Sequence, residues 1–284
     1  MKIVKNYRKN DTLRHSLNRL ATETFGLSFE SWYQNGFWND KYIPYSMVEN
    51  DEVIANVSAN IIDILHNGQI RSFIQLGTVM TAETYRNKGL IRQIMKEIEQ
   101  DFKDKTDGFF LFAGRDVLEF YPKFGFVKDK EYQYSKTVNI TQSQTVQPLS
   151  MNCMEKWKQL EKAMQTNQFH GQFDMINNSD LIMFYITNFM QDSVYYDRKN
   201  NAYIIAEIED GCLFIHNIFA NTAVTLEEEI QAFGSDIKRV VLGFTPKDTD
   251  GYTVNELKIE DTNLFVRGFN LDNQKVMFPT LSHA

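Results

Sequence analysis

The chain has 284 residues, 43% of them hydrophobic, and a formal net charge of −7, which is enough apolar material for two domains of ordinary size. An acidic chain lacks the broad basic surface that phosphate backbones require, so nonspecific nucleic-acid binding is not expected. No run of eighteen apolar residues occurs, and the polar start "MKIVKNYRKND" is unlike a signal peptide. We therefore expect a cytoplasmic protein that does not span or bind a membrane.

In chain order, the sequence predicts a helix over residues 12–24, an aromatic-rich segment, and then a group of strands. The strand candidates are "YSMV", "EVIANVSANIIDIL" and "IRSFIQLGTVMT", and the turn signals "ENDE" and "HNGQ" between them indicate an antiparallel meander. Over residues 89–102 apolar residues recur at helical spacing, and the apolar run "FFLFAG" follows. A strand, a crossover helix and a second strand make a right-handed unit with parallel strands, so a mixed sheet is expected.

The polar segment "TQSQTVQPLS", residues 141–150, is the best candidate for a linker. It would separate a first domain, residues 1–140, from a smaller C-terminal α+β domain, residues 151–284. After an initial helix, the second part shows strand-like runs, a helix and a further strand, in the same order as the first part. Two interpretations stay open: a degenerate internal repeat, or an unrelated α+β domain.

The cysteines and histidines do not form the spacing of a metal site. Cys153 and Cys212 lie in apolar runs and form no CxxC motif, which predicts small core residues rather than a disulfide or a metal pair. The histidines are scattered without the i, i+3 or i, i+4 spacing that gathers ligands on one helix. We expect no metal cofactor.

The segment "TYRNKGLIRQIM" places a glycine and basic residues where a strand passes into a helix. The first turn of a helix has N–H groups without intrahelical partners, and the helix dipole favours negative charge there. Gly89 lets the backbone approach a ligand closely, while Arg86, Lys88 and Arg92 add local positive charge. Neither GxxxxGK[ST] nor GxGxxG is present. The junction therefore suits phosphate oxygens, or is simply a basic helix start with a turn glycine.

Over residues 1 to about 140, the chain resembles the GNAT superfamily of acyl-CoA-dependent N-acetyltransferases. "GTVMTAETYRNKGL" is similar to the strand-to-loop signature of that family, whose core is [RQ]-x-x-G-x-[GA]. The resemblance implies an α+β (mixed α/β) fold with splayed parallel strands in the central sheet, and acetyl-CoA as the acyl donor. It also implies two sets of coenzyme A contacts, a strand end that bonds the pantetheine arm and a loop that holds the pyrophosphate: Met80 and Thr81, then Arg86, Asn87, Lys88, Gly89, Leu90 and Ile91.

The segment "FYPKFGF" resembles the terminal segment of the same family, in which a tyrosine stands near the coenzyme sulfur as general acid. By position this residue is Tyr121. A phenol with its ordinary pKa near 10 is protonated at neutral pH and can donate to a departing thiolate. The residues themselves also allow a purely structural role, as a core tyrosine in a cluster with Phe120, Phe124 and Phe126.

Together these features predict direct transfer of an acetyl group from acetyl-CoA to an amine of a small molecule or peptide. Because Ile91 stands where the signature has Gly or Ala, a non-catalytic acyl-CoA-binding or sensor protein stays an alternative. The identity of the acceptor and the oligomeric state are left open. Several carboxylates are conceivable as the base, and the sequence singles out none of them: Glu30, Asp40, Glu83, Asp116 and Glu119.

Two further expectations concern the rest of the chain. An aromatic segment is expected either over the acceptor cleft or in ordinary core packing: Phe29, Trp32, Tyr33, Phe37, Trp38, Tyr42 and Tyr45. In the second part, the place of the basic loop is taken by "ANTAVTLEEEI", whose acidic residues would repel a pyrophosphate. One coenzyme site per chain is therefore expected.

Overall fold

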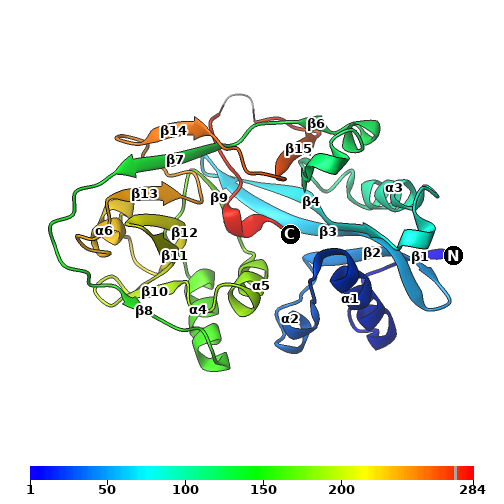
Figure 1. Ribbon diagram of the computed structural model, residues 1–284, viewed down its shortest axis with the longest axis horizontal. Helices are drawn as coiled ribbons and strands as arrows, with labels where there is room; N and C mark the ends of the chain where they lie inside the picture. Colours follow the sequence, from blue (N-terminus) through cyan, green and yellow to red (C-terminus); the bar gives the residue numbers. More distant parts are fainter. Residues whose placement is uncertain (272–273) are drawn as a thin grey trace.

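The computed structural model describes residues 1–271 and 274–284, and it is a mixed α/β structure built on two sheets (Figure 1). The first sheet contains β1 (Lys2–Lys5), β2 (Tyr42–Glu49), β3 (Glu52–His66), β4 (Gln69–Thr81), β5 (Gly108–Ala113), β6 (Val127–Lys128), β9 (Phe173–Ile176) and β15 (Asn263–Arg267). Its strand order is β1-β2-β3-β4-β5-β15-β6, and β9 pairs with β3 off this path. The predicted fold class is confirmed.

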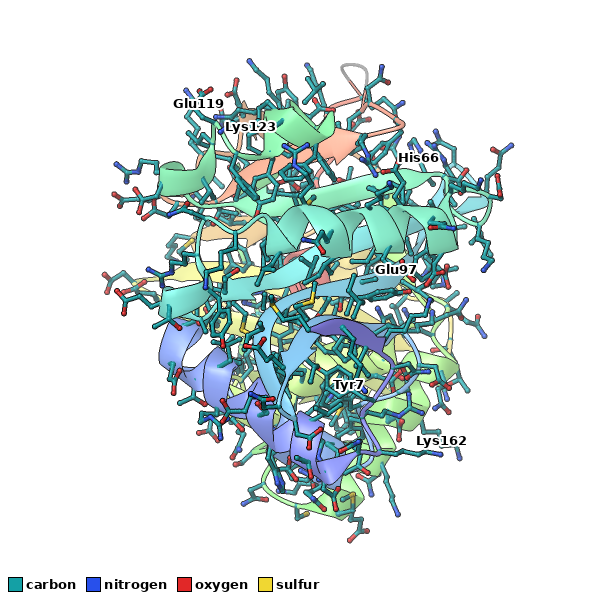
Figure 2. The ribbon with its side chains drawn as sticks, turned by 90° about the vertical axis from the view of Figure 1, so that its right-hand side faces the viewer. Tyr7, His66, Glu97, Glu119, Lys123 and Lys162 are labelled. Atoms are coloured by element: carbon teal, nitrogen blue, oxygen red, sulfur yellow. The ribbon has the colours of Figure 1, made fainter. Side chains whose placement is uncertain are left out.

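The meander and the parallel pair of the first sheet follow the sequence prediction. β2, β3 and β4 are antiparallel neighbours, and β5 runs parallel to β4. The crossover is α3 (Leu90–Phe102), which packs on one face of the sheet through Leu90, Ile94 and Ile98 (Figure 2). The regular spacing of these apolar residues gives the helix a single buried side, which is why its position could be predicted.

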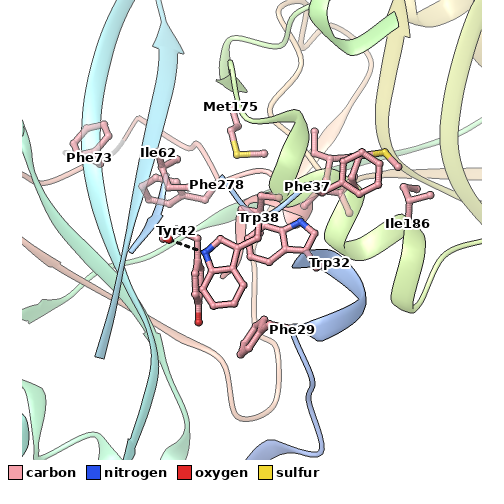
Figure 3. Close-up of a cluster of buried hydrophobic side chains, with 14 of the residues drawn as sticks. Phe29, Trp32, Phe37, Trp38, Tyr42, Ile62, Phe73, Met175, Ile186 and Phe278 are labelled. Carbon is pink, nitrogen blue, oxygen red and sulfur yellow. Dashed lines mark hydrogen bonds between the residues drawn. The ribbon is translucent and has the colours of Figure 1, made fainter. Parts of the chain in front are cut away.

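The opposite face of the first sheet carries α1 (Asp11–Phe25) and α2 (Glu30–Gln34). α1 begins after Asn10, whose side chain accepts a hydrogen bond from the Leu13 N–H, and it ends at Gly26 in the left-handed conformation. The aromatic segment that follows is buried. Apart from Tyr45, which packs in the cluster under α3, its side chains form one cluster with residues of both halves of the chain, and the indole N–H of Trp38 donates to the carbonyl of Tyr42 (Figure 3).

The second sheet contains β7 (Tyr132–Thr137), β8 (Gln147–Pro148), β10 (Val194–Asp197), β11 (Ala202–Glu209), β12 (Cys212–Ala220), β13 (Arg239–Leu242) and β14 (Thr253–Glu256). Its order is β14-β7-β13-β12-β11-β10-β8. The second half also contains α4 (Met154–Gln165), α5 (Ser179–Asn188) and α6 (Leu226–Gln231). Short 3₁₀ turns complete the chain: η1 (Glu83–Tyr85), η2 (Arg115–Val117), η3 (Tyr121–Phe124) and η4 (Thr280–Ser282).

The two sheets repeat one topology. β10, β11 and β12 are antiparallel neighbours, α6 follows, and β13 runs parallel to β12. This is the order of β2, β3, β4, α3 and β5 in the first sheet. The agreement covers strand direction as well as strand order, so of the two interpretations the topology favours an internal repeat.

Each sheet contains a strand from the other half of the chain. β7 precedes the predicted linker, yet it pairs with β13 and β14 in the second sheet. β15 lies near the C-terminus, yet it lies between β5 and β6 in the first sheet. The division into residues 1–140, 141–150 and 151–284 remains a prediction, and these two strands cross it.

Parts of the predicted linker pack on the second sheet. Val146 is buried in the core of that sheet, and its N–H donates to the carbonyl of Ala232. Gly234 lies so close that a Cβ there would be 2.4 Å from the Gln144 nitrogen. The prediction for the cysteines was wrong for Cys153, which is exposed beside the start of α4, whereas Cys212 is half-buried. No helix in residues 1–271 or 274–284 has the length and hydrophobicity needed to cross a bilayer.

Glu131 gives the fold a pH dependence that can be measured. Its carboxylate is 7% exposed and accepts a hydrogen bond from the Phe278 N–H at 2.8 Å, and burial raises its pKa to about 8. The folded protein therefore keeps a proton that the unfolded chain loses near pH 4.5, so folding becomes less favourable as the pH rises from about 4.5 to 8.

Glu131→Gln retains an oxygen that can accept from the Phe278 N–H but cannot ionise. We expect this variant not to lose stability between pH 5 and pH 8 through this position. Its unfolding free energy should exceed that of the parent by an amount that grows between pH 5 and pH 8, on the order of a few kcal/mol. Urea denaturation at both pH values measures the difference. Glu256→Gln is the control, because that carboxylate pairs with Lys130 at the surface. Parallel pH profiles for the parent and Glu131→Gln would contradict the assignment.

Candidate active site

A cleft opens where the two parallel strands of the first sheet separate. β4 and β5 pair only between Phe73–Gln75 and Gly108–Phe110, and the strands diverge beyond this point. The cleft has a volume of about 970 Å³ and is lined by the ends of both strands, by the start of α3 and by the segment around η2 and η3. All of the predicted coenzyme-binding residues and Tyr121 line this one cleft.

The end of β4 is irregular at the cleft. The register with β3 shifts between Asn56 and Ser58, and Thr78 has a positive φ of 48°. The side-chain amide of Asn56 donates to the Thr78 carbonyl at 2.9 Å and holds this bulge. Because the Met80 side chain is buried in the core, the group that Met80 can offer to a ligand is its main chain.

The loop before α3 has the geometry of an anion site. Asn87 and Gly89 both adopt the left-handed conformation, with φ of 63° and 71°. Gly89 is the N-cap, no side chain caps the helix, and its first turn contains no acidic residue. The amides of this turn are therefore free to meet a ligand. Successive N–H groups in such a turn converge on one point, which favours an anion.

The positive charge of this loop is not neutralised within the described part of the chain. Arg86, Lys88 and Arg92 are exposed and form no ion pair among residues 1–271 and 274–284. Lys88 lies over the Tyr85 ring at 4.5 Å, and Arg92 lies over the Phe124 ring at 5.2 Å. These contacts leave the charges available to an anion. Leu90 is buried and Ile91 is half-buried, both against the core under α3, which leaves the main chain of Leu90 and Ile91 at the cleft, together with the exposed part of the Ile91 side chain.

Tyr121 lies at the other side of the cleft, at the start of η3. It is 5% exposed and packs against the rings of Phe120, Phe126 and Phe265. Burial raises the pKa of Tyr121 to about 12, so the phenol is protonated at neutral pH. The structural and catalytic interpretations are thus compatible, because the ring belongs to the core cluster while the residue lines the cleft.

Of the five carboxylates considered as a base, only Asp116 lines the cleft. Glu30 is bound to Arg14 at 2.9 Å, and this ion pair lowers its pKa. Asp40 is paired with Arg8 on the surface, and Glu83 and Glu119 are exposed. Since Asp116 is itself exposed on η2, the structure does not single it out as a base.

The sequence did not reveal that residues 283–284 lie in this cleft. A Cβ on Gly77 would be 2.2 Å from the main-chain oxygen of Ala284, so the glycine allows the segment to lie against β4. The imidazole of His283 stacks on Phe112 with ring centroids 3.7 Å apart. Burial lowers the pKa of His283 to about 4, so the ring is neutral at physiological pH. Local patterning carries no signal for a contact between positions so distant in sequence.

The corresponding place in the second sheet is closed. There η4 lies beside the end of β13: the Thr280 N–H donates to the Gly243 carbonyl at 2.8 Å, and the Thr280 hydroxyl contacts His216 Nδ1 at 2.9 Å. α6 has a capping box formed by Thr225 and Glu228 and three glutamates in its first turn. The backbone N–H groups at the start of α6 therefore either donate to the capping side chains already or lie beside negative charge, which disfavours an anion.

These features agree with the comparison with known families. The sequence matches the acetyltransferase (GNAT) domain family over residues 11–128. Residues 11–128 belong to the GNAT family. The matched segment contains the strands β2 to β5, α3, the basic loop and Tyr121. No curated protein matches the sequence.

Several solved structures are similar in fold to this chain beyond residues 11–128 as well. A probable N-acyltransferase from Enterococcus faecalis is 16% identical, with a TM-score of 0.61 over 94% of this chain and 71% of the other. Eis1 from Mycobacterium abscessus is 11% identical, with a TM-score of 0.56 over 93% of this chain and 72% of the other. A GCN5-related N-acetyltransferase from Kribbella flavida is 14% identical, with a TM-score of 0.53 over 94% of this chain and 72% of the other. Because over nine-tenths of this chain is covered, the shared fold includes the second sheet.

Proposed function

We propose that the protein transfers an acetyl group from acetyl-CoA to an amine, with coenzyme A bound in the cleft between β4 and β5. The observation that carries this proposal is the convergence of the predicted strand end, the basic loop and Tyr121 on one cleft. The pyrophosphate would meet the loop of residues 86–91, and the pantetheine arm would follow the main chain of Met80 and Thr81. The thioester would then lie between the separated strands.

The reaction that fits this arrangement is a direct attack. A neutral amine forms a bond to the thioester carbonyl carbon, and a main-chain N–H of the separated strand stabilises the negative charge on the oxygen. The carbon–sulfur bond breaks as Tyr121 donates its proton to the sulfur; the nitrogen loses one proton to water, and the tyrosinate takes one proton back from water, so no net proton is released. Holding both reactants in one cleft supplies much of the rate.

The test is acetyl-CoA-dependent thiol release and amide formation with a panel of primary amines. Amide product from at least one amine, formed in step with free coenzyme A, is the expected result. Binding of coenzyme A without product from any amine would favour the alternative of an acyl-CoA sensor. A protein that neither binds acetyl-CoA nor releases thiol would refute the proposal.

We also expect one molecule of coenzyme A per chain. The second sheet has η4 at the place of the cleft and an acidic start to α6, so both of the interactions needed for coenzyme A are missing there. Calorimetric titration of the whole chain measures the stoichiometry. Two equivalent sites per chain would contradict this reading of the second half.

A further inference from the structure

A second cavity adjoins the cleft on the other face of the first sheet. It has a volume of about 320 Å³ and shares Phe25, Thr78, His283 and Ala284 with the cleft. Its walls come from the aromatic segment of the first half and from α5 of the second half. We call this cavity the aromatic pocket. Its principal walls are Phe29, Trp32, Tyr42, Leu181, Phe184 and Tyr185.

The polar atoms of these walls are already used within the protein. The Trp32 indole N–H donates to the Asp180 carbonyl at 2.8 Å, and the Tyr185 hydroxyl donates to the His283 carbonyl. The Tyr42 hydroxyl bonds to Thr78 at 3.0 Å and to Ser58 at 2.9 Å. What remains for an occupant is a surface of ring faces and edges, which favours an apolar group.

The lack of charged side chains in the aromatic pocket also favours an apolar occupant. Among the described residues that line it there is no Asp, Glu, Lys or Arg, and its His283 is neutral at physiological pH. The other polar groups of the lining, those of Thr78, His283 and the Ala284 main chain, lie on the side shared with the cleft, so away from that side a charged group would lose its hydration without a partner. An apolar cavity of about 150 Å³ can hold benzene, so this pocket has room for an aromatic ring with a short arm.

The mouth of the aromatic pocket opens to solvent between two exposed phenylalanines. Phe25 at the end of α1 is 47% exposed, and Phe189 after α5 is 59% exposed. Exposed aromatic rings beside an apolar cavity mark a surface where a ligand enters. None of the basic-loop residues 86–91 lines the aromatic pocket, so an occupant of this pocket need not pass the loop that would hold the pyrophosphate. An acyl chain would enter the cleft together with coenzyme A and would not need the mouth of the aromatic pocket, so this mouth favours an acceptor that enters separately.

Tyr121 and the aromatic pocket lie on opposite faces of the first sheet. Tyr121 belongs to the core cluster under α3, whereas the aromatic pocket is formed against α1, α2 and α5 on the other face of the sheet. If the sulfur departs toward Tyr121, an amine that arrives from the aromatic pocket approaches the carbonyl from another direction. Such an approach leaves the side of Tyr121 free for the departing sulfur, and direct attack needs the nitrogen held close to the carbonyl carbon.

We infer that the aromatic pocket binds the apolar, preferably aromatic, part of the acceptor amine and presents its nitrogen at Thr78. This inference rests on the proposed function, and it assigns much of the acceptor specificity to α5 of the second half. The step itself is the one given above: the carbon–nitrogen bond forms, the carbon–sulfur bond breaks, and the proton lost by the nitrogen balances the proton gained by the sulfur.

The test compares 2-phenylethylamine with ethanolamine, which shares its two-carbon arm, with acetyl-CoA as donor. We expect kcat/KM to be at least tenfold higher for 2-phenylethylamine, because its ring is removed from water in the pocket. Phe189→Ala should lower this preference at least threefold through a higher KM for 2-phenylethylamine, with the KM for acetyl-CoA unchanged. Phe189 lines the aromatic pocket but not the cleft, and its exposure makes the substitution compatible with folding.

The control is Ile208→Ala, which removes an exposed apolar side chain of β11 outside both cavities and should behave as the parent. Equal kcat/KM values for the two amines would overturn the inference. So would a preference for octanoyl-CoA over acetyl-CoA that Phe189→Ala abolishes, since the pocket would then hold the acyl chain.

Calorimetry with 2-phenylethylamine keeps the inference separate from the proposed function. Binding that is weakened by Phe189→Ala, without acetyl transfer to any amine, would support the pocket and refute the acetyltransferase. Neither binding nor transfer of 2-phenylethylamine would overturn the inference, even if another amine is acetylated.

Discussion

Tyr121→Phe is expected to lower kcat for acetyl transfer at least a hundredfold while the KM for acetyl-CoA changes little. General acids contribute between about 10² and 10⁴ in rate, and the substitution removes only the hydroxyl. The ring would still pack against Phe126 and Phe265, so folding and coenzyme binding should be preserved. Single-turnover transfer to the best amine is the measurement, because it reports the chemical step even if product release limits kcat.

The matched control for this experiment is Tyr45→Phe. Tyr45 belongs to the same core cluster, but its hydroxyl bonds to Asp101 at 2.7 Å, and it does not line the cleft. We expect Tyr45→Phe to lower the midpoint of thermal unfolding and to leave kcat nearly normal. A folded Tyr121→Phe protein that keeps more than about half of the single-turnover rate would remove Tyr121 from the role of acid.

Gly89→Glu is expected to weaken coenzyme A binding at least tenfold, or by about 1.4 kcal/mol. The substitution acts in two ways, since it places a side chain at a φ of 71° and a carboxylate beside the amides that would meet the pyrophosphate. A Cβ at this position meets no atom within 4 Å, so steric overlap is not the cause. A negative charge at the start of α3 also favours the helix, so stability should change little.

Two variants separate charge from conformation in this experiment. Gly251→Glu introduces the same side chain at a φ of 77° where a Cβ also meets nothing, and it should leave coenzyme A binding unchanged. Gly89→Asn retains a residue that tolerates the left-handed conformation without adding charge, and its effect should be smaller. Unchanged calorimetric affinity in folded Gly89→Glu would refute the assignment of the loop.

The parts of the fold that could be predicted are those with local patterns. The meander has turn signals between its strands, and α3 has one apolar side, so their order followed from the sequence, although β2 begins three residues before the predicted "YSMV". α5 was not predicted, because "SDLIMFYITN" is apolar on most sides and gives no helical period. The places of β7 and β15 depend on pairing between distant residues, which local patterns do not encode.

The candidate site divides in the same way. The residues of one continuous segment, the strand end and the basic loop, could be named because a short motif contains them. Their common cleft with Tyr121 follows from the separation of β4 and β5. His283 and the walls contributed by α5 could not be found, because only the folded chain brings them beside Thr78.

The position of β15 in the first sheet constrains how the protein can be synthesised. While the ribosome extends the chain, the GNAT domain emerges first. β5 can pair with β4 at once, but its other edge has no neighbour until β15, residues 263–267, has left the exit tunnel. An unpaired strand edge is prone to pair with other chains. Nascent molecules therefore remain exposed to aggregation during most of translation, and a ribosome that stalls in the second half releases a protein with an incomplete first sheet.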